Sequence, residues 1–483
     1  MERRSFLGGA AATLSAAMGV PAPGQGTRPP NILFVLSDDH SRPHLGINGA
    51  DWMRTPNLDQ FGREGMVFER AFTAAPQCVP SRTALMTGRS PVAARMGRFS
   101  APLPRDVTTV PEVLRMRGYH TGVCGRYFHL DGQVNPAPLT KQIYDKHNLK
   151  TWKNRVDVMD ISGQPKTTAL FTDFLARAPK DKPWFFWINY SDPHHPWDAS
   201  VRKIDPSSVK LPPHWPDLPG LRGDLARYAA EIEHADRDFG DVMAALRKAG
   251  QEENTLVVFM GDNGMAFPHG KGSLYDLGLN VPLMARWPGR IKPGRTRTLI
   301  SGEDIAATFM DAGGASLPAG VTGRSFYPLL QGGAYQPREY IFAARLHHGN
   351  GPMTPETKAS TFDLSRCVRS DKYKLIYNLT PQMEYQPVDS AGDPGWLEMK
   401  AAHAEGKLKP EFDRAYFGSR PVLELYDLDA DPGELHNLAG KPEMRDVQQS
   451  LMAALQEKLV IDSDFVPPVL MESVPRQPAR KKQ

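Results

Sequence analysis

Four short apolar runs, each followed at once by polar residues, constrain the fold of this chain more than any other feature. They lie at 31–36, 119–124, 183–188 and 255–260. Continuous apolar runs of this length are typical of parallel strands buried on both faces. Because ligands of an open α/β sheet bind outside the carboxyl ends of its strands, we expect the four polar clusters to meet at one edge of the sheet.

The segments between and after these runs complete the predicted fold. Apolar residues spaced three and four apart from Tyr228 to Leu246 predict a helix in which His234 is a packing or surface residue. From about residue 340, alternating segments at 340–342, 367–377 and 423–427, separated by turn-rich loops, predict a small antiparallel sheet, with a last helix near 443–459. The predicted fold class is therefore α/β, a central mostly parallel sheet flanked by helices, with a smaller C-terminal α+β subdomain.

The two ends of the chain differ from its body. The net charge of +4 comes largely from basic residues at the ends, so the body is close to neutral and nucleic-acid binding has no compositional support. Arg3 and Arg4 precede an apolar stretch that ends near Val20, a layout that resembles a twin-arginine export signal, although an ordinary flexible terminus is the alternative. No run is long enough to span a membrane.

These features predict four segments: a signal peptide at 1–26, a catalytic domain at 27–335, a C-terminal subdomain at 336–470 and a basic tail at 471–483. The predicted location is outside the cytoplasm, either periplasmic or secreted. The oligomeric state is not predicted.

Acidic side chains follow two of the apolar runs. Asp38 and Asp39 follow the first run, and Asp262 and Asn263 follow the last. Carboxylates brought this close repel one another unless a cation lies among them, and an all-oxygen donor set suits Ca²⁺ or Mg²⁺. The alternative is that each pair forms a turn or caps a helix. Two pairs at matching strand ends favour the metal site.

Cys78 begins the most informative short segment. Pro80 and Ser81 suit the start of a helix, which would place the thiol at a helix N-terminus, where an anion is stabilised. One interpretation is a thiol nucleophile, but the cysteine phosphatase loop needs an arginine six positions after the cysteine, where this chain has Ala84. The other interpretation is a buried free cysteine.

The segments Cys78-Val-Pro-Ser-Arg82 and Thr87-Gly88-Arg89 resemble the signature of the sulfatase family in the alkaline phosphatase superfamily. The resemblance implies an alkaline-phosphatase-like fold. It also implies that a formylglycine-generating maturation enzyme oxidises Cys78 to formylglycine (3-oxoalanine) before folding. The modified residue 78 would then join Asp38, Asp39, Asp262 and Asn263 around Ca²⁺, with Mg²⁺ as the alternative ion.

The resemblance also assigns roles to residues around the nucleophile. The hydrate on residue 78 would attack sulfur, with Asp262 as the proton acceptor. Arg82 and Arg126 would hold the hydrate and the sulfate oxygens, and Lys271 would neutralise charge on the transferring group.

Two histidines would move protons in the reaction that the resemblance implies. His194 would assist Lys271 and protonate the leaving atom, and His129 would remove a proton from the second hydroxyl to expel sulfate. One departure from the family pattern stands beside them: Gly125-Arg126 replaces the usual Gly-Lys. Arginine keeps the positive charge and can still bind sulfate, but its side chain is bulkier and planar. The resemblance therefore does not decide whether Arg126 also assists the nucleophile.

Within the family, Asp192-Pro-His194 and the segment from Gly261 to Lys271 look most like the N-sulfoglucosamine sulfohydrolase branch. The implied substrate is a sulfate ester or sulfamate of a sulfated small molecule or oligosaccharide. Three donor-rich residues of the C-terminal part are candidate substrate contacts or ordinary loop residues: Arg345, His347 and His348. Two alternatives remain, a phosphate or phosphonate ester hydrolase of the same superfamily, and a non-catalytic binding protein with unmodified Cys78.

Overall fold

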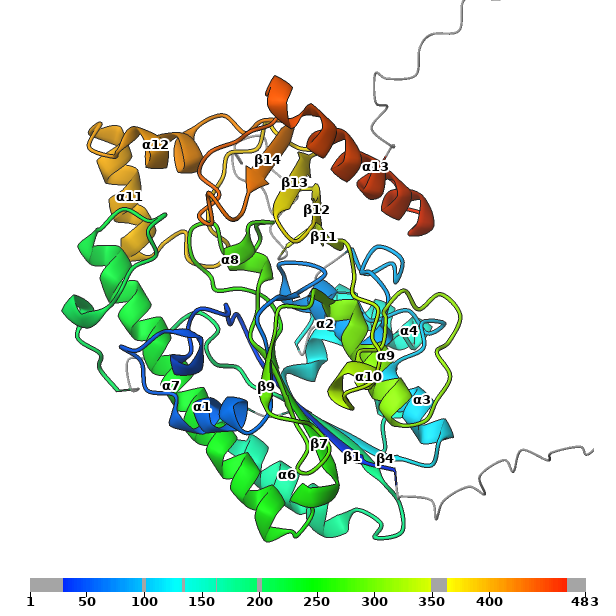
Figure 1. Cartoon of the computed structure of the whole chain (residues 1–483). Coiled ribbons are helices and arrows are strands. Elements are labelled where there is room, and N and C mark those ends of the chain that lie inside the picture. Colours follow the sequence, from blue (N-terminus) through cyan, green and yellow to red (C-terminus); the bar gives the residue numbers. More distant parts are fainter. Residues whose placement is uncertain are drawn as a thin grey trace, which may run out of the picture.

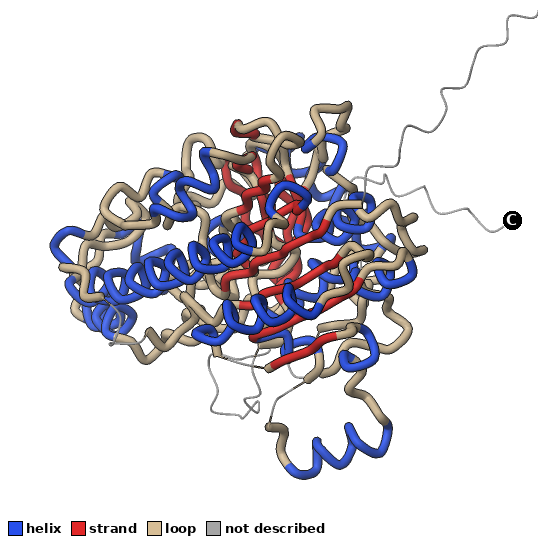
Figure 2. Tube along the Cα trace, turned by 90° about the horizontal axis from the view of Figure 1, so that it is seen from below, coloured by secondary structure: helices blue, strands red, loops and turns tan. Residues whose placement is uncertain are grey.

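The computed structural model of the chain describes residues 29–97, 101–132, 135–161, 163–197, 202–348 and 363–466. The predicted signal peptide at 1–26 and the basic tail at 471–483 lie outside the described residues. Helices cover both faces of a central sheet, and a second sheet with its own helix lies above one end (Figures 1 and 2). None of the helices in the described ranges combines the length and the apolar character needed to cross a membrane.

The central sheet has eight strands in the order β5-β4-β6-β1-β7-β8-β2-β9. The first five strands in this order are parallel, whereas β8 runs antiparallel to both of its neighbours. The strands are β1 (Asn31–Ser37), β2 (Met66–Phe68), β4 (His120–Gly125), β5 (Val158–Asp160), β6 (Trp184–Asn189), β7 (Thr255–Gly261), β8 (Leu283–Arg286) and β9 (Gly294–Thr296). All four strands predicted from apolar runs are therefore present, and β1 lies between β6 and β7.

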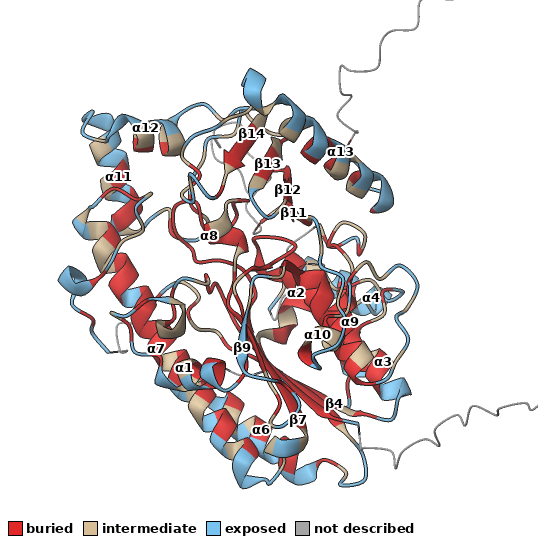
Figure 3. Ribbon diagram, viewed as in Figure 1, coloured by how far each residue is buried: buried red, intermediate tan, exposed pale blue. Residues whose placement is uncertain are grey.

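The apolar runs are continuous because side chains on both faces of the sheet are buried. In β1, Leu33 and Val35 belong to one core, while Ile32, Phe34 and Leu36 belong to the core on the opposite face. Neither face of this strand meets water, so neither needs polar residues. The inner strands of the sheet are buried, whereas the edge strands β5 and β9 are largely exposed, as are the outer faces of the helices (Figure 3).

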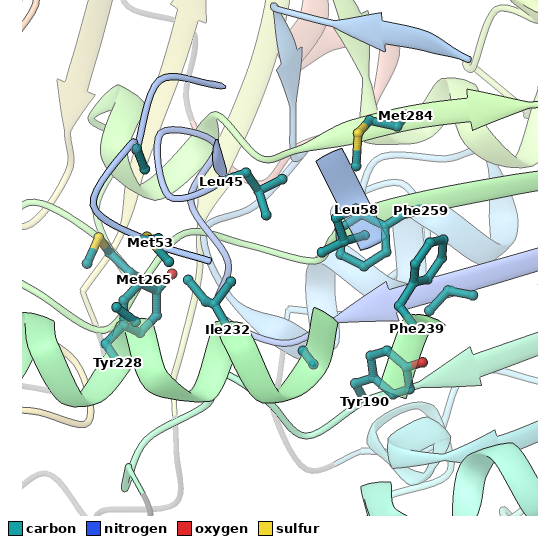
Figure 4. Close-up of a cluster of buried hydrophobic side chains, with 14 of the residues drawn as sticks. Leu45, Met53, Leu58, Tyr190, Tyr228, Ile232, Phe239, Phe259, Met265 and Met284 are labelled. Atoms are coloured by element: carbon teal, nitrogen blue, oxygen red, sulfur yellow. The ribbon is translucent and has the colours of Figure 1, made fainter. Parts of the chain in front are cut away.

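Helices cover the two faces of the sheet. The helices of this part of the chain are α1 (Pro56–Arg63), α2 (Cys78–Thr87), α3 (Val110–Met116), α4 (Pro138–His147), α5 (Trp152–Arg155), α6 (Thr167–Arg177), α7 (Pro219–Lys248), α8 (Asp276–Leu279), α9 (Gly302–Ala312) and α10 (Tyr327–Leu330). Helices α1, α6 and α7 pack on one face, whereas α2, α3 and α9 pack on the other. The predicted helix around 228–246 is the C-terminal part of α7 and buries Tyr228, Ile232 and Phe239 (Figure 4).

A smaller antiparallel sheet occupies the C-terminal part of the chain. Its strands, in spatial order, are β11 (Ile341–Arg345), β12 (Ser365–Arg369), β13 (Tyr373–Asn378) and β14 (Leu423–Asp427). One face packs on α13 (Arg445–Ile461), and the other packs on the larger N-terminal part of the chain through Phe72, Leu274 and Leu279. A pair of short strands, β3 (Ala71–Phe72) and β10 (Ile300–Ser301), lies beside this contact. The predicted fold class is confirmed.

Two local expectations for the C-terminal part were wrong. The alternating segment 367–377 is two strands, because the chain turns at 370–372 and pairs β12 with β13. The turn-rich loop expected between β13 and β14 contains two helices, α11 (Pro394–Ala404) and α12 (Pro410–Phe417). Trp396, Met399, Phe412 and Tyr416 anchor these helices in the same core as α7. Contact with α7 therefore explains α11, and the burial of Phe412 and Tyr416 in the same core explains α12.

Candidate active site

The polar clusters that follow four strands meet at one edge of the sheet. In the pairing register, Ser37 of β1 lies opposite Gly261 of β7, and Asn189 of β6 lies opposite both Leu36 and Gly125. The chain leaves each strand at the same level, so the side chains that follow are brought together. Asp38, Asp39, Asp262 and Asn263 are all completely buried there.

Helix α2 brings Cys78 into this cluster. Cys78 is the first residue of the helix and is completely buried, with its Sγ 3.3 Å from Asp38 Oδ1 and 3.8 Å from Asp39 Oδ1. Burial and the nearby Asp38 carboxylate raise the pKa of the Cys78 thiol well above its usual value. Gln77 precedes the helix and exchanges two 3.0 Å hydrogen bonds with the backbone of Leu346, which ties the start of α2 to the C-terminal subdomain.

Arg82 lies one turn further along α2 and is also completely buried. Its guanidinium donates to Asp38 Oδ2 at 2.9 Å, to Asp262 Oδ2 at 3.0 Å and to Asn189 Oδ1 at 3.0 Å. A fourth hydrogen bond reaches the backbone oxygen of Arg126. The arginine therefore connects the ends of β1, β7 and β6 through one planar group.

The 3₁₀ helix η2 (Arg126–Leu130) follows β4 and carries two more predicted residues. Arg126 Nη1 lies 3.0 Å from Asp38 Oδ2, and its Nη2 lies 3.5 Å from His129 Nε2. Burial and the nearby Arg82 and Arg126 charges lower the pKa of His129, so its imidazole is neutral. Burial alone would raise the pKa of Asp38, but Arg126 and Arg82 hold it well below its usual range.

Lys271 and His194 lie on the other side of the cluster. Lys271 Nζ is 2.8 Å from Asp39 Oδ1 and 2.7 Å from Asp389 Oδ2. His194 Nε2 is 3.9 Å from Asp39 Oδ2 and 3.7 Å from Asp389 Oδ2. Burial and the Lys271 charge lower the pKa of His194 to about 3, so its imidazole is neutral when no anion is bound. Asp38, Asp39, Cys78 and His194 each offer one ligand atom within a common 4.8 Å.

The donor chemistry of the cluster fits a divalent cation. Asn263 Nδ2 donates to Asp39 Oδ1 at 2.8 Å, whereas the buried Asn263 Oδ1 has no hydrogen-bond partner among the described residues. A buried acceptor without a donor is costly, and a cation beside it would satisfy it. Burial raises the pKa of Asp39 to about 8 and that of Asp262 to about 6, the penalty expected when carboxylates gather without a cation. Asp38, Asp39, Asp262 and Asn263 fit Ca²⁺ or Mg²⁺.

The three candidate substrate contacts differ in their positions. Arg345 is buried, and its Nε lies 3.2 Å from Asp363 Oδ2 in an ion pair. His348 Nε2 is 3.4 Å from Asp389 Oδ1, so it approaches the cluster through Asp389. His347 is next to it in the chain and is partly exposed.

Sequence reasoning missed two residues of the cluster. Asp389 lies in a loop without periodicity and reaches Lys271 from the C-terminal subdomain. Burial alone would raise the pKa of Asp389, but Lys271 and His348 hold it far below its usual range. Asn189 is the last residue of β6 and holds Arg82. Asn189 could have been found from its position at the end of a predicted strand, whereas nothing in the sequence around Asp389 indicates its role.

Comparison with known proteins agrees with this geometry. The family description "Sulfatase" matches residues 30–315, and "N-sulphoglucosamine sulphohydrolase, C-terminal" matches residues 267–411. Human arylsulfatase A is 30% identical over 473 residues, covering 86% of this chain and 84% of that protein. An ulvan-active sulfatase of Formosa agariphila is 29% identical, with 88% and 78% covered. Human N-sulphoglucosamine sulphohydrolase is 26% identical, with 88% of each chain covered.

Solved structures share the fold at low sequence identity. A structure described as being in complex with its substrate, D-glucosamine-2-N,6-O-disulfate, aligns with a TM-score of 0.66 at 19% identity, covering 92% of this chain and all of that one. A putative sulfatase from Bacteroides fragilis aligns with a TM-score of 0.67 at 18% identity, covering 92% of this chain and 98% of that one.

Proposed function

The chain belongs to the sulfatase family, and from that premise we propose that it hydrolyses a sulfate ester or sulfamate of a sulfated carbohydrate, through formylglycine made from Cys78 and with a bound divalent cation. The observation that carries the proposal is the position of Cys78. Cys78 is the first residue of helix α2, and its Sγ lies 3.3 Å from Asp38 Oδ1 and 3.8 Å from Asp39 Oδ1 at the end of β1. The resemblance of the sequence to the family is confirmed.

The residues around Cys78 fit the two groups that the proposal requires. A cation and formylglycine would supply Lewis-acid chemistry and a nucleophile that can be regenerated. Asp38, Asp39, Asp262 and Asn263 would hold the cation, because the unpartnered Asn263 Oδ1 and the raised pKa of Asp39 both call for a positive charge. Ca²⁺ suits the all-oxygen set, and Mg²⁺ is the alternative.

The cationic side chains would orient the sulfate group. Arg82 is fixed by four hydrogen bonds and Arg126 by its contact with Asp38, so both present charge with little freedom to move. Lys271 is held by Asp39 and Asp389 on the opposite side. Positive groups placed in advance stabilise charge as it develops on the transferring group. Arg126 would perform this role in place of the usual lysine.

Three groups would move protons. Asp262 would accept the proton of the attacking hydroxyl, because the family resemblance places its carboxylate beside residue 78. His129 has a lowered pKa and would therefore act as a proton acceptor in the second step. His194 would protonate the leaving atom. Its pKa of about 3 would rise when a sulfate anion binds beside it, because a nearby negative charge favours the imidazolium form.

The substrate and the cellular location extend the proposal. The match of residues 267–411 to the C-terminal part of N-sulphoglucosamine sulphohydrolase supports an N- or O-sulfated amino sugar as the substrate. Arg345, His347 and His348 would then contribute to the sugar side of the site, with Arg345 acting through Asp363. We also propose export through the signal-like segment at 1–26, which places the enzyme in the periplasm or outside the cell, after a formylglycine-generating enzyme has modified it.

The deciding experiment is hydrolysis of an aryl sulfate beside the matching aryl phosphate, with protein produced together with a formylglycine-generating enzyme. Mass spectrometry of the peptide that carries residue 78 measures the conversion. Cys78→Ala should abolish sulfate hydrolysis, whereas Cys367→Ala, a matched change at another buried cysteine, should keep it.

If the aryl phosphate is hydrolysed faster than the aryl sulfate, the protein is a phosphohydrolase of the same superfamily and not a sulfatase. Converted protein that is inactive on both aryl esters should be assayed with N-sulfated and 6-O-sulfated glucosamine. Inactivity on these sugars as well would refute the proposed function.

A further inference from the structure

A groove of about 750 Å³ lies on the C-terminal subdomain, outside the cluster described above. It runs between the segment at 381–386, α11 and α12. Its walls include four aromatic residues, Tyr385, Trp396, Tyr416 and Phe417. Lys400 and Arg420 add positive charge, and Gln382 and Gln386 add amide groups. A concave site with aromatic walls and a few polar groups is the usual composition of a small-ligand site.

The aromatic wall is a stack of rings. The rings of Trp396 and Phe417 are stacked at 5.1 Å with 15° between their planes, and those of Phe417 and His403 at 4.3 Å with 10° between them. Trp396 is buried, Phe417 is partly exposed, and the His403 side chain is 43% exposed, so the stack leads outward from the core. Because stacking covers the faces of Phe417, a sugar ring would contact the partly exposed edge of Phe417 and the exposed ring of His403, rigid groups that lose little entropy on binding.

The polar groups of the groove suit an anionic sugar chain. Lys400 is exposed and makes no ion pair with any other residue that the structure describes. Arg420 is held by Asp363 Oδ2 at 2.8 Å and by Asn378 Oδ1 at 2.9 Å, which fixes its position at the groove wall. Glu384 also lines the groove and offers an acceptor for a hydroxyl group. A surface with both cations and acceptors fits a polyhydroxylated ligand that carries sulfate or carboxylate groups.

Tyr385 joins the groove to the candidate active site. Its ring contacts Trp396 edge to face at 5.8 Å, and its hydroxyl accepts the backbone N–H of His269 at 2.5 Å, two residues before Lys271. Four residues after Tyr385, Asp389 lies 2.7 Å from Lys271 Nζ. Four residues of extended chain span at most about 14 Å. One loop therefore forms the groove wall at one end and contacts the catalytic cluster at the other.

We propose that this groove is a second carbohydrate-binding site, which holds sugar units of the same anionic glycan beyond the unit that loses its sulfate. The inference rests on the proposed function, because it assigns the rest of the substrate to a place beside the site of cleavage. It commits the protein to oligosaccharides of several units rather than to single sugars.

The test measures KM for substrates of two lengths, with enzyme in which residue 78 has been converted to formylglycine. Disaccharides and hexasaccharides prepared from heparan sulfate and from ulvan are assayed beside an aryl sulfate. For the glycan that is hydrolysed, we expect the KM of the hexasaccharide to be lower than that of the disaccharide. Lys400→Ala and Phe417→Leu should each raise the hexasaccharide KM by about tenfold, with kcat/KM for the aryl sulfate unchanged. Lys407→Ala removes an exposed lysine outside the groove and should change neither value.

Binding to the full-length Cys78→Ala chain, measured by calorimetry with both hexasaccharides, separates this inference from the proposed function. Binding that is weakened about tenfold by Lys400→Ala supports the groove even when the converted enzyme hydrolyses no sulfate. Hydrolysis with the same KM for both lengths, or hexasaccharide binding that is absent or insensitive to Lys400→Ala and Phe417→Leu, would overturn the inference.

Discussion

Replacing Arg82 with alanine tests whether this arginine holds the strand ends together. In Arg82→Ala, Asp38 and Asp262 each lose a hydrogen-bonded ion pair inside the protein. Removing one partner of a buried ion pair costs about 3–5 kcal/mol, because the other charge stays buried and uncompensated. Arg126 still faces Asp38 and limits the loss there. We therefore expect the free energy of unfolding to fall by about 4 kcal/mol.

Thermal unfolding in the presence of a chelator measures this loss. The unfolding entropy is about 2.1 cal/mol/K per residue, so a chain of 483 residues should lose about 4 °C in Tm. Arg95→Ala is the control, because Arg95 pairs with Asp106 on the surface, where an ion pair contributes about 0–1 kcal/mol. Equal shifts for the two variants would show that the Arg82 network does not stabilise the fold.

Three further predictions concern the surroundings of the site. Ca²⁺ at a hundredfold excess over its Kd should stabilise the folded chain by about 2.7 kcal/mol and raise Tm by about 3 °C. If Ca²⁺ raises the Tm of Asp262→Asn by the same amount, Asp262 is not a ligand of the cation. His234 Nδ1 lies 2.6 Å from Asp192 Oδ2, and this hydrogen bond raises the pKa of His234. This pair stabilises the fold below about pH 6.5 and is lost as the pH rises through the raised pKa, so His234→Gln should lower Tm at pH 5.5 and by less at pH 9; equal losses would contradict the ion pair. In Gly125→Ala the new Cβ would lie 1.9 Å from the backbone oxygen of Asn189 in β6, so we expect the free energy of unfolding to fall by more than about 3 kcal/mol. Gly118→Ala has a similar positive φ but open space, so its expected cost is about 1 kcal/mol, and a larger loss at Gly118 than at Gly125 in thermal unfolding would refute the steric argument.

The sequence predicted four neighbouring strands of the central sheet, β4, β6, β1 and β7, and the residues that follow them, for one physical reason. A parallel strand buried on both faces has to be apolar throughout, so the first polar residue marks the strand end where ligands bind. Asp38 and Asp262, although far apart in the chain, are brought together by the pairing of β1 with β7. The same reasoning covered Arg126 and His129 after β4.

The parts that the sequence did not predict depend on contacts between distant segments. Helix α11 has apolar residues, but their spacing gives no clear amphipathic face, and only the packing of Trp396 and Met399 beside α7 shows why the segment is helical. Asp389 has no pattern around it, and its importance follows from a 2.7 Å contact with Lys271 made across two subdomains. Loops that complete a site in this way carry no periodic signal, because their conformation follows from the elements that they join.

The burial of Cys78 limits when the proposed modification could take place. In the folded chain the side chain has no exposed surface, so an enzyme that modifies it has to act before the pocket closes. The pocket cannot close until Asp262 has been synthesised, 180 residues after its partner Arg82. At about 5–20 residues per second, that interval lasts roughly ten to forty seconds. The long separation between the two halves of the site therefore sets a minimum interval during which Cys78 would stay accessible to the proposed modifying enzyme.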